Sequence, residues 1–170
     1  MEETQLYHIT CINYSIGTIP PIVDTSHFHQ ATLNDDRRWI NDFLDANRPP
    51  IVPSRKRSFY AFDSITNCVG YWSSKRCTIG GPLLYKVKMT NPSKVPMHLV
   101  NTLLQKGEGN AANLQIATEY WHPTENWKFY EFLSEEMEVL ERVDLKPEHR
   151  FNNAIILIGQ DRDLAKRLYL

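Results

Sequence analysis

Short runs of aromatic and β-branched residues alternate along this chain with longer segments in which apolar residues recur at helical spacing. The first short run, residues 5–12, has the composition of a β-strand and is followed by a glycine and two prolines that break it. The first periodic segment, residues 35–47, is typical of an amphipathic helix that stops at Pro49 and Pro50. Because this alternation continues to the end of the chain, the sequence predicts an α+β fold.

The same signals predict the remaining elements. Strands are expected at 59–62, 83–89, 127–133 and 137–145, and helices at 65–72, 97–106 and 111–121. Asp63 or Ser64 is the expected N-cap of the helix that starts at residue 65, because either side-chain oxygen accepts from free amides of the first turn. Two readings stay open for residues 154–159: β-branching favours a strand, while the helical pattern that follows allows one continuous helix.

Length and composition indicate one ordinary globular domain. The 170 residues fit a single domain, 1–170, that buries a core without disulfides or metals. Hydrophobic residues make up 42% of the chain and charged residues 23%, so neither a disordered nor a fibrous class is indicated. The net charge of -1 gives no overall field that would attract nucleic acid or anionic membranes.

The cysteines and the first residues bear on the compartment. Three cysteines without a Cys-x-x-Cys spacing argue against a disulfide framework and a zinc ribbon, and fit reduced thiols. The N-terminus is acidic and polar, and no uncharged apolar run approaches the length of a membrane span. We therefore expect a cytoplasmic protein with no membrane partner. His27 and His29 would share a face of an extended segment, but nothing nearby completes a metal site, so no metal is expected.

Four polar or aromatic residues stand out by type and spacing. His8 lies on the first predicted strand, Tyr60 and Tyr71 are eleven residues apart, and Glu131 lies on a late predicted strand. Cleavage of NAD at its nicotinamide develops positive charge on the ribose, which a nearby carboxylate stabilises. Two tyrosine rings provide flat faces for a cationic nicotinamide ring, and histidine bonds a hydroxyl through either nitrogen.

At these residues the chain resembles the ADP-ribosyltransferase superfamily, in the branch shared by diphtheria-type toxins and poly(ADP-ribose) polymerases, with its His-Tyr-Glu triad. In that family the first strand carries His-x-Thr, a tyrosine is followed eleven residues later by a second, and a glutamate opens a late strand. All three features occur here in that order. The resemblance covers four stretches and leaves the 35–47 helix and the last twenty or so residues unmatched; the matched stretches are 6–10, 59–72, 84–89 and 127–143.

The resemblance implies a fold and an activity. The expected fold is a split, mainly antiparallel sheet with flanking helices, and NAD would lie as co-substrate in a cleft between the sheet halves. The expected activity is transfer of ADP-ribose from NAD to an acceptor, with release of nicotinamide. The implied catalytic residues are Glu131, which stabilises the cationic transition state and holds a ribose hydroxyl, His8, which bonds the ribose, and Tyr60.

The resemblance also implies which residues contact NAD. Tyr60 and Tyr71 would sandwich the nicotinamide, the backbone at Ile9 would hold its carboxamide, and Ser64 would support the site, bonding back to the first strand. Ile9 stands where many relatives have glycine. The implied NAD-binding set is His8, Ile9, Thr10, Tyr60, Ser64 and Tyr71. The acceptor is expected to be a macromolecule, a protein in the first instance and nucleic acid as the alternative, as in small toxin-like phage or bacterial enzymes.

Three alternatives remain open. Glu119 also follows both tyrosines and precedes aromatic residues, but its stretch has helical periodicity, so Glu131 is preferred. With water as acceptor, the same site would make the protein an NAD glycohydrolase. A different class is an interaction protein, because Pro50–Arg55 has the Pro-x-x-Pro spacing with a trailing arginine that polyproline-binding domains recognise. We expect an extended connector there. Contact with the pyrophosphate of NAD or with an acidic target is an alternative for Arg55 and Arg57, whose side chains are by default solvated.

Overall fold

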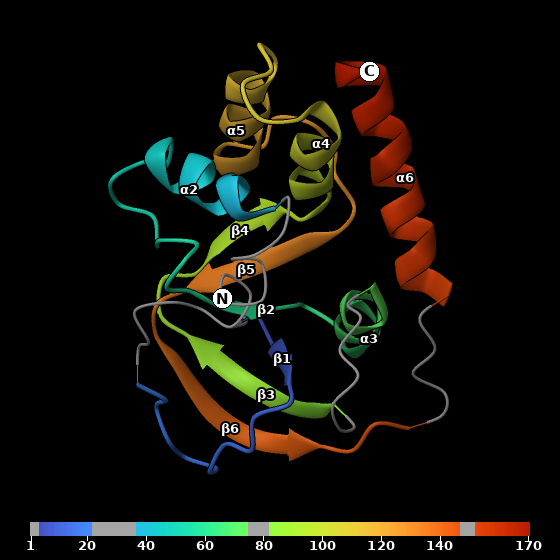
Figure 1. The fold of residues 1–170 in the computed structure, drawn as a ribbon. Coiled ribbons are helices and arrows are strands. Elements are labelled where there is room, and N and C mark those ends of the chain that lie inside the picture. Colours follow the sequence, from blue (N-terminus) through green and yellow to red (C-terminus); the bar gives the residue numbers. More distant parts are fainter. Residues whose placement is uncertain (1–3, 22–36, 75–81, 147–151) are drawn as a thin grey trace.

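The computed structural model describes residues 4–21, 37–74, 82–146 and 152–170. Within them it contains six strands and five helices that alternate along the chain (Figure 1). In order these are β1 (Leu6–Thr10), α2 (Arg38–Ala46), β2 (Phe59–Ala61), α3 (Ile65–Ser74), β3 (Leu83–Met89), β4 (Ser93–Pro96), α4 (His98–Lys106), α5 (Asn113–Trp121), β5 (Tyr130–Ser134), β6 (Met137–Val143) and α6 (Asn152–Tyr169). The predicted α+β class is confirmed. His27 and His29 lie outside the described residues.

The strands form two small antiparallel sheets. One has the order β1-β3-β6 and the other the order β2-β5-β4. A single bridge joins them, in which the Tyr7 amide donates to the Phe62 carbonyl and the Phe62 amide to the Tyr7 carbonyl, both at 2.8 Å. Beyond this bridge β1 and β2 continue in different sheets, so the junction is where side chains of the two halves meet.

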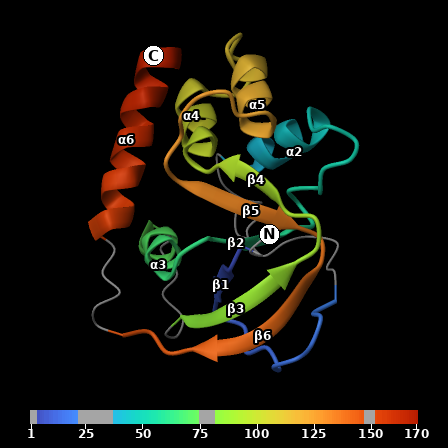
Figure 2. The same cartoon turned by 180° about the vertical axis from the view of Figure 1, so that it is seen from behind.

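Helices cover the two sheets unequally. Figure 1 and the reverse view in Figure 2 show α2, α4 and α5 gathered beyond β4 and β5, with β3 and β6 at the opposite end of the molecule. A core cluster fills the space between these helices and the second sheet, with Leu44, Leu99, Ile116 and Leu133 fully buried. None of the helices in the described residues combines the length and apolar character that a bilayer crossing demands.

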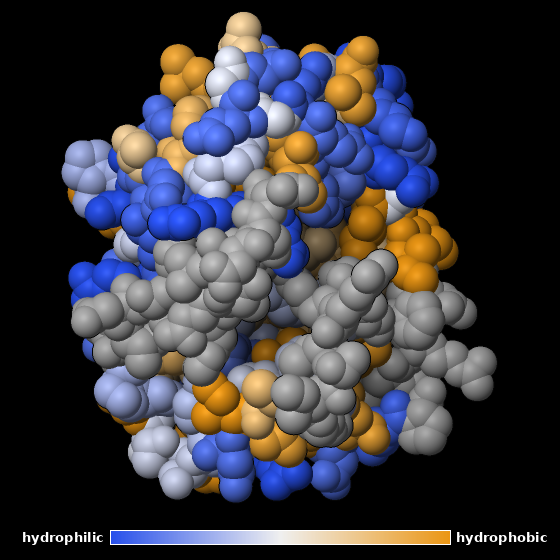
Figure 3. All heavy atoms as spheres, in the orientation of Figure 1, coloured by the Kyte–Doolittle hydropathy of each residue, from blue (hydrophilic) through white to orange (hydrophobic). Residues whose placement is uncertain are grey.

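The segment left open by the sequence, residues 154–159, is helical. It belongs to α6, in which Ala154 is fully buried while Ile155 and Ile156 are 51% and 56% exposed. Hydrophobic atoms are visible along this part of α6 in the space-filling view (Figure 3). The isoleucine-rich run therefore places apolar side chains on the outside of a helix, an arrangement that β-propensity alone does not anticipate.

Gly70 of α3 is the point of closest approach to α6. A Cβ built at Gly70 would lie 2.3 Å from the Cβ of Ala154, far inside van der Waals contact. Gly70→Ala is therefore expected to lower the free energy of unfolding by about 1–3 kcal/mol, although alanine is the better helix former. Urea denaturation checks this. The matched control is Gly159→Ala in α6, where the nearest atom is 3.9 Å away on a flexible arginine and no loss is expected; equal effects would contradict the packing argument.

The sequence analysis missed one strand and was wrong about one proline-rich segment. Residues 93–96, for which no element was expected, form β4, which pairs with β5. β4 stands at the edge of its sheet, where a proline costs no ladder hydrogen bond. The segment after α2 is not extended but folds into consecutive turns, with Val52 N bonding to Pro49 O and Arg57 N to Ser54 O, both at 3.2 Å. These turns carry Arg55 inward.

Candidate functional site

His8 is attached to the neighbouring strand by its side chain. Its Nδ1 lies 2.6 Å from the backbone carbonyl oxygen of Tyr60. Because a carbonyl only accepts, Nδ1 carries the proton in this contact. The ring centroid lies 5.9 Å from that of Tyr14 and 6.4 Å from that of Phe59. The imidazole is thus held at the point where β1 and β2 separate.

The backbone of Ile9 faces this junction. In an antiparallel strand the amide and carbonyl groups of successive residues point to opposite sides. Both groups of Tyr7 bond to Phe62, away from β3, so the amide and carbonyl of Ile9 also point away from β3. The Ile9 side chain itself is buried against Phe62 and Leu84. The Ile9 side chain therefore packs in the core, while the amide and carbonyl groups of Ile9 are directed toward the β2 side.

Thr10 and Ser64 serve local structure. The Thr10 hydroxyl accepts the amide of Ile12 at 3.1 Å. The Ser64 hydroxyl accepts the amide of Asn67 at 3.1 Å, which confirms the expected N-cap of α3. The contact from this helix back to β1 comes from another residue, because the Cys68 thiol lies 3.2 Å from the Tyr7 carbonyl oxygen. Ser64 thus supports the site by fixing where α3 begins.

The two tyrosines reach the junction from different elements. Tyr60 lies on β2, is 8% exposed, and donates its hydroxyl to the Arg55 carbonyl at 2.7 Å. Tyr71 lies on α3 with its ring centroid 4.8 Å from that of Phe62. Burial raises the pKa of Tyr71 well above its ordinary value, and the negative charge of Glu131 and the proximity of Tyr60 act in the same direction. Tyr71 therefore stays protonated and lies within electrostatic reach of both.

Glu131 projects from β5 on the same face as Tyr60. The register places Tyr60 opposite Leu133, and residues two apart on a strand share a face. The Glu131 side chain is 1% exposed. Its Oε1 accepts from Arg55 Nη1 at 2.6 Å and from the Tyr120 hydroxyl at 3.0 Å. The structure thus brings the carboxylate together with both tyrosines and fixes it by two donors.

Arg55 is the residue that the sequence interpretation missed. It is 2% exposed rather than solvated. Its Nε donates to Asn41 Oδ1 at 2.8 Å, and Nη1 donates to the Tyr120 hydroxyl as well as to Glu131. The guanidinium carbon lies 5.3 Å from the ring centroid of Tyr60 and 5.5 Å from that of Tyr120. Burial opposes its charge, but Tyr120, Tyr60 and Glu131 outweigh burial and raise the Arg55 pKa.

Two signals in the sequence point to single members of this network but not to the network itself. Asn41 occupies a position on α2 beside buried Ile40, where an apolar residue is the usual choice. Tyr120 recurs at helical spacing after Ile116 and so belongs to the buried side of α5. Neither signal identifies the partner, because the turns that bring Arg55 to these residues are set by tertiary packing. Arg57, in contrast, is exposed, and its Nη2 lies 3.8 Å from Oε2 of Glu135.

Glu119 has a structural role. Its carboxylate accepts the Thr124 amide at 2.8 Å, the Thr124 hydroxyl at 2.7 Å, the Glu125 amide at 2.9 Å and the Trp127 indole at 2.7 Å. Burial alone would raise the pKa of Glu119, but these hydrogen bonds outweigh it and hold the pKa below its ordinary value. The four donors close the loop that leads from α5 toward β5. The Glu119 carboxylate is therefore engaged in holding this loop.

A pH-dependent prediction follows from Glu119. A carboxyl group whose pKa is lower in the folded state stabilises the fold above its unfolded pKa of about 4.3, and this contribution is lost as pH falls through the folded value. Glu119→Gln is therefore expected to lower the free energy of unfolding by about 1–3 kcal/mol at pH 7. At pH 3 the difference from wild type should largely vanish. Urea denaturation at the two pH values measures it, and an equal difference at both would contradict the assignment.

The arginine of the Pro50–Arg55 motif is not accessible to a polyproline-binding domain. Arg55 is buried in the Glu131 network, and the prolines lie in turns rather than in an extended helix. Ile51 projects outward and is 96% exposed. A polyproline-binding domain would therefore find neither the arginine nor the regular ridge that it recognises.

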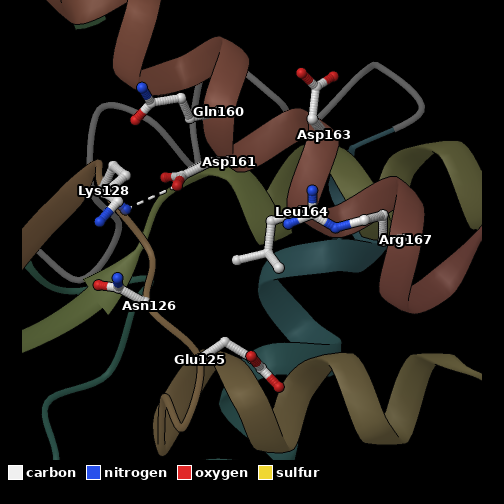
Figure 4. A pocket seen from close by; sticks show the side chains of 8 residues that line it. All are labelled: Glu125, Asn126, Lys128, Gln160, Asp161, Asp163, Leu164 and Arg167. Atoms are coloured by element: carbon white, nitrogen blue, oxygen red, sulfur yellow. Dashed lines mark hydrogen bonds between the residues drawn. The ribbon is translucent and has the colours of Figure 1, made fainter.

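A separate hollow of about 530 Å³ lies between α6 and the segment that follows α5 (Figure 4). Charged groups of both signs line it, together with two amides and Leu164; the charged groups are Glu125, Lys128, Asp161, Asp163 and Arg167. Asp161 already accepts the amides of Lys128 at 2.7 Å and Phe129 at 2.8 Å. Asp161 lies on α6, so these two hydrogen bonds fix the segment before β5 to that helix. None of the lining residues belongs to the predicted NAD site.

Comparison with known proteins returned no match: neither a protein-family model nor a curated protein sequence is significantly similar to the chain.

Proposed function

We propose that this protein transfers ADP-ribose from NAD to an acceptor and releases nicotinamide. The observation that carries the proposal is that Tyr60, Tyr71 and Glu131 lie within electrostatic reach of one another, beside the strand to which His8 bonds. His8 bonds to the backbone of Tyr60, while Tyr71 lies within electrostatic reach of Tyr60 and Glu131. These side chains come from four different elements, and the sequence reasoning selected them by residue type and spacing alone.

The arrangement of the sheets supports the proposal. Two three-stranded antiparallel sheets, joined by one bridge and flanked by helices, agree with the split, mainly antiparallel sheet that the resemblance to ADP-ribosyltransferases implies. In that fold NAD lies between the sheet halves. The junction beside Tyr7 and Phe62 is the corresponding position here. The helix α2 and most of α6, which the resemblance does not cover, pack outside this junction.

The junction residues suit the nicotinamide end of NAD. A carboxamide needs one acceptor and one donor, and the amide and carbonyl of Ile9 are directed toward the β2 side. Tyr71 stays neutral, so its ring offers an apolar face with a polar edge. The Nε2 of His8 suits a ribose hydroxyl. NAD supplies the glycosidic bond that breaks, and the chain's residues orient it and exclude water.

Glu131 is the proposed catalytic residue. A buried carboxylate beside the ribose stabilises developing positive charge more strongly than one in water, because the surroundings screen less. Arg55 and Tyr120 hold that carboxylate through Oε1. Neither of these two donors engages Oε2. We assign Oε2 the role of binding a ribose hydroxyl, and Tyr60 the role of forming the wall beside it.

The test uses purified protein and two labelled forms of NAD. With label in the nicotinamide, the protein is expected to release free nicotinamide, and NAD is expected to raise the melting temperature. With label in the adenylate and host lysate present, label should move to a protein or nucleic acid fraction. Free ADP-ribose without a labelled macromolecule would identify a glycohydrolase. Neither release of nicotinamide nor a melting shift at millimolar NAD would overturn the proposal.

A further inference from the structure

We propose that Tyr120, at the end of α5, is a positioning residue for the Glu131 carboxylate. This inference rests on the proposed function and extends it to a residue that the sequence motifs do not include. The Tyr120 hydroxyl donates to Glu131 Oε1 at 3.0 Å and accepts from Arg55 Nη1. Arg55, Tyr120 and Glu131 therefore form a closed hydrogen-bonded triangle. Tyr120 is one of the two donors in it that bond to Oε1 of the carboxylate.

The position of Tyr120 is rigid. The residue is 0% exposed, and its ring centroid lies 4.8 Å from that of Trp121 in an edge-on contact. Trp121 is fixed in turn, because its indole donates to the Leu44 carbonyl on α2 at 2.8 Å. A phenol held in this way reaches Glu131 without having to be ordered when substrate binds. Such prior ordering is what a positioning residue contributes to a site.

The hydroxyl remains a donor at every physiological pH. Burial raises the pKa of Tyr120 well above its ordinary value; Arg55 opposes this shift, and the charge of Glu131 reinforces it. A phenolate would be repelled by the carboxylate, so the proton stays on Tyr120. Both donors to Glu131 meet on Oε1, so they orient the carboxylate without engaging Oε2, the oxygen assigned to the ribose hydroxyl.

The charged and polar groups around Glu131 come from several elements. Arg55 approaches from the turns before β2, Tyr60 from β2, Tyr71 from α3 and Tyr120 from α5. Arg55 is the cation among them, and it supplies the opposite charge. Tyr120 fixes the orientation of the carboxylate, because its phenol has a single donor on a ring that is held in place, whereas a guanidinium offers several donors. Removing the hydroxyl alone should therefore leave the ion pair in place and loosen its geometry.

The experiment compares Tyr120→Phe with Tyr85→Phe in the full chain, with NAD as the probe. Tyr85 is the matched control, because its hydroxyl is also fully buried, accepts the Tyr14 amide at 3.0 Å and lies outside the Glu131 network. For Tyr120→Phe we expect kcat for nicotinamide release to fall by about 10- to 100-fold, the size of one hydrogen bond to a charged group, with KM for NAD changed less than about twofold. Tyr85→Phe should keep both kcat and KM.

Each other outcome has a distinct meaning. If Tyr120→Phe loses activity only in proportion to its unfolded fraction, with kcat per folded molecule equal to that of wild type, the positioning role is wrong and the proposed function stands. If both phenylalanine variants lower kcat equally, the effect belongs to general stability, and the positioning role is again wrong. If wild type releases no nicotinamide, the proposed function itself fails, and with it the role of Tyr120.

Discussion

Glu131→Gln is expected to lower the rate of nicotinamide release by about 100- to 1,000-fold, the usual cost of removing a group that stabilises transition-state charge. Glutamine keeps the shape of the side chain and one oxygen that accepts from Arg55, but it has no charge to oppose the cationic ribose. Binding of NAD should change much less than turnover, because the ground state gains little from that charge. Steady-state kinetics with labelled NAD measure both.

The Glu131→Gln variant also weakens a buried ion pair, so its folding must be measured beside its activity. A loss of up to about 3 kcal/mol in the free energy of unfolding is expected, which leaves a domain of ordinary stability folded at 25 °C. Glu135→Gln is the matched control. Glu135 also holds the turns before β2, accepting the Ser54 amide at 2.9 Å, but does not contact Arg55. Full activity in Glu131→Gln, or equal losses in both variants, would contradict the assignment.

Arg55→Met is expected to lower the free energy of unfolding by about 3–5 kcal/mol, the usual cost of leaving one member of a buried ion pair without its partner. The change leaves Glu131 as a buried charge without its counter-charge and removes the donor to Asn41. Methionine fills much of the volume of the arginine stem, so the loss reports mainly on charge. Urea denaturation at neutral pH measures it.

The double variant Arg55→Met with Glu131→Leu separates charge from packing. Removing both members of a buried ion pair leaves no unpaired charge, so the double variant should be more stable than Arg55→Met alone by about 1–3 kcal/mol. It should also be inactive. Additive losses in the double variant would show that the pair is solvated and does not form the buried network described above.

The candidate site residues could be selected from the sequence because their spacing reflects local structure. Tyr60 lies in the strand β2, Ser64 caps the next helix, and Tyr71 lies on that helix, so the eleven-residue interval is set by one short β-α unit. Residue type then limits the candidates further. The distances between His8, this unit and Glu131 could not be predicted, because they depend on how β1 and β5 pair with distant strands.

The Arg55 network lay beyond sequence reasoning for a physical reason. Burial of a guanidinium is unfavourable unless several acceptors surround it, and a sequence does not show which distant residues provide them. Here the acceptors come from α2, α5 and β5, which are separated by long stretches of chain. The edge strand β4 was missed for a related reason, since four residues that include a proline form a strand only because β5 offers an open edge.

A crystal structure of the protein with a non-hydrolysable NAD analogue tests the account most directly. The account predicts the carboxamide on the backbone of Ile9, the nicotinamide ring beside Tyr60 and Tyr71, and a ribose hydroxyl on the Oε2 atom of Glu131. An analogue bound away from the β1–β2 junction, or no bound analogue in crystals soaked at millimolar concentration, would contradict it.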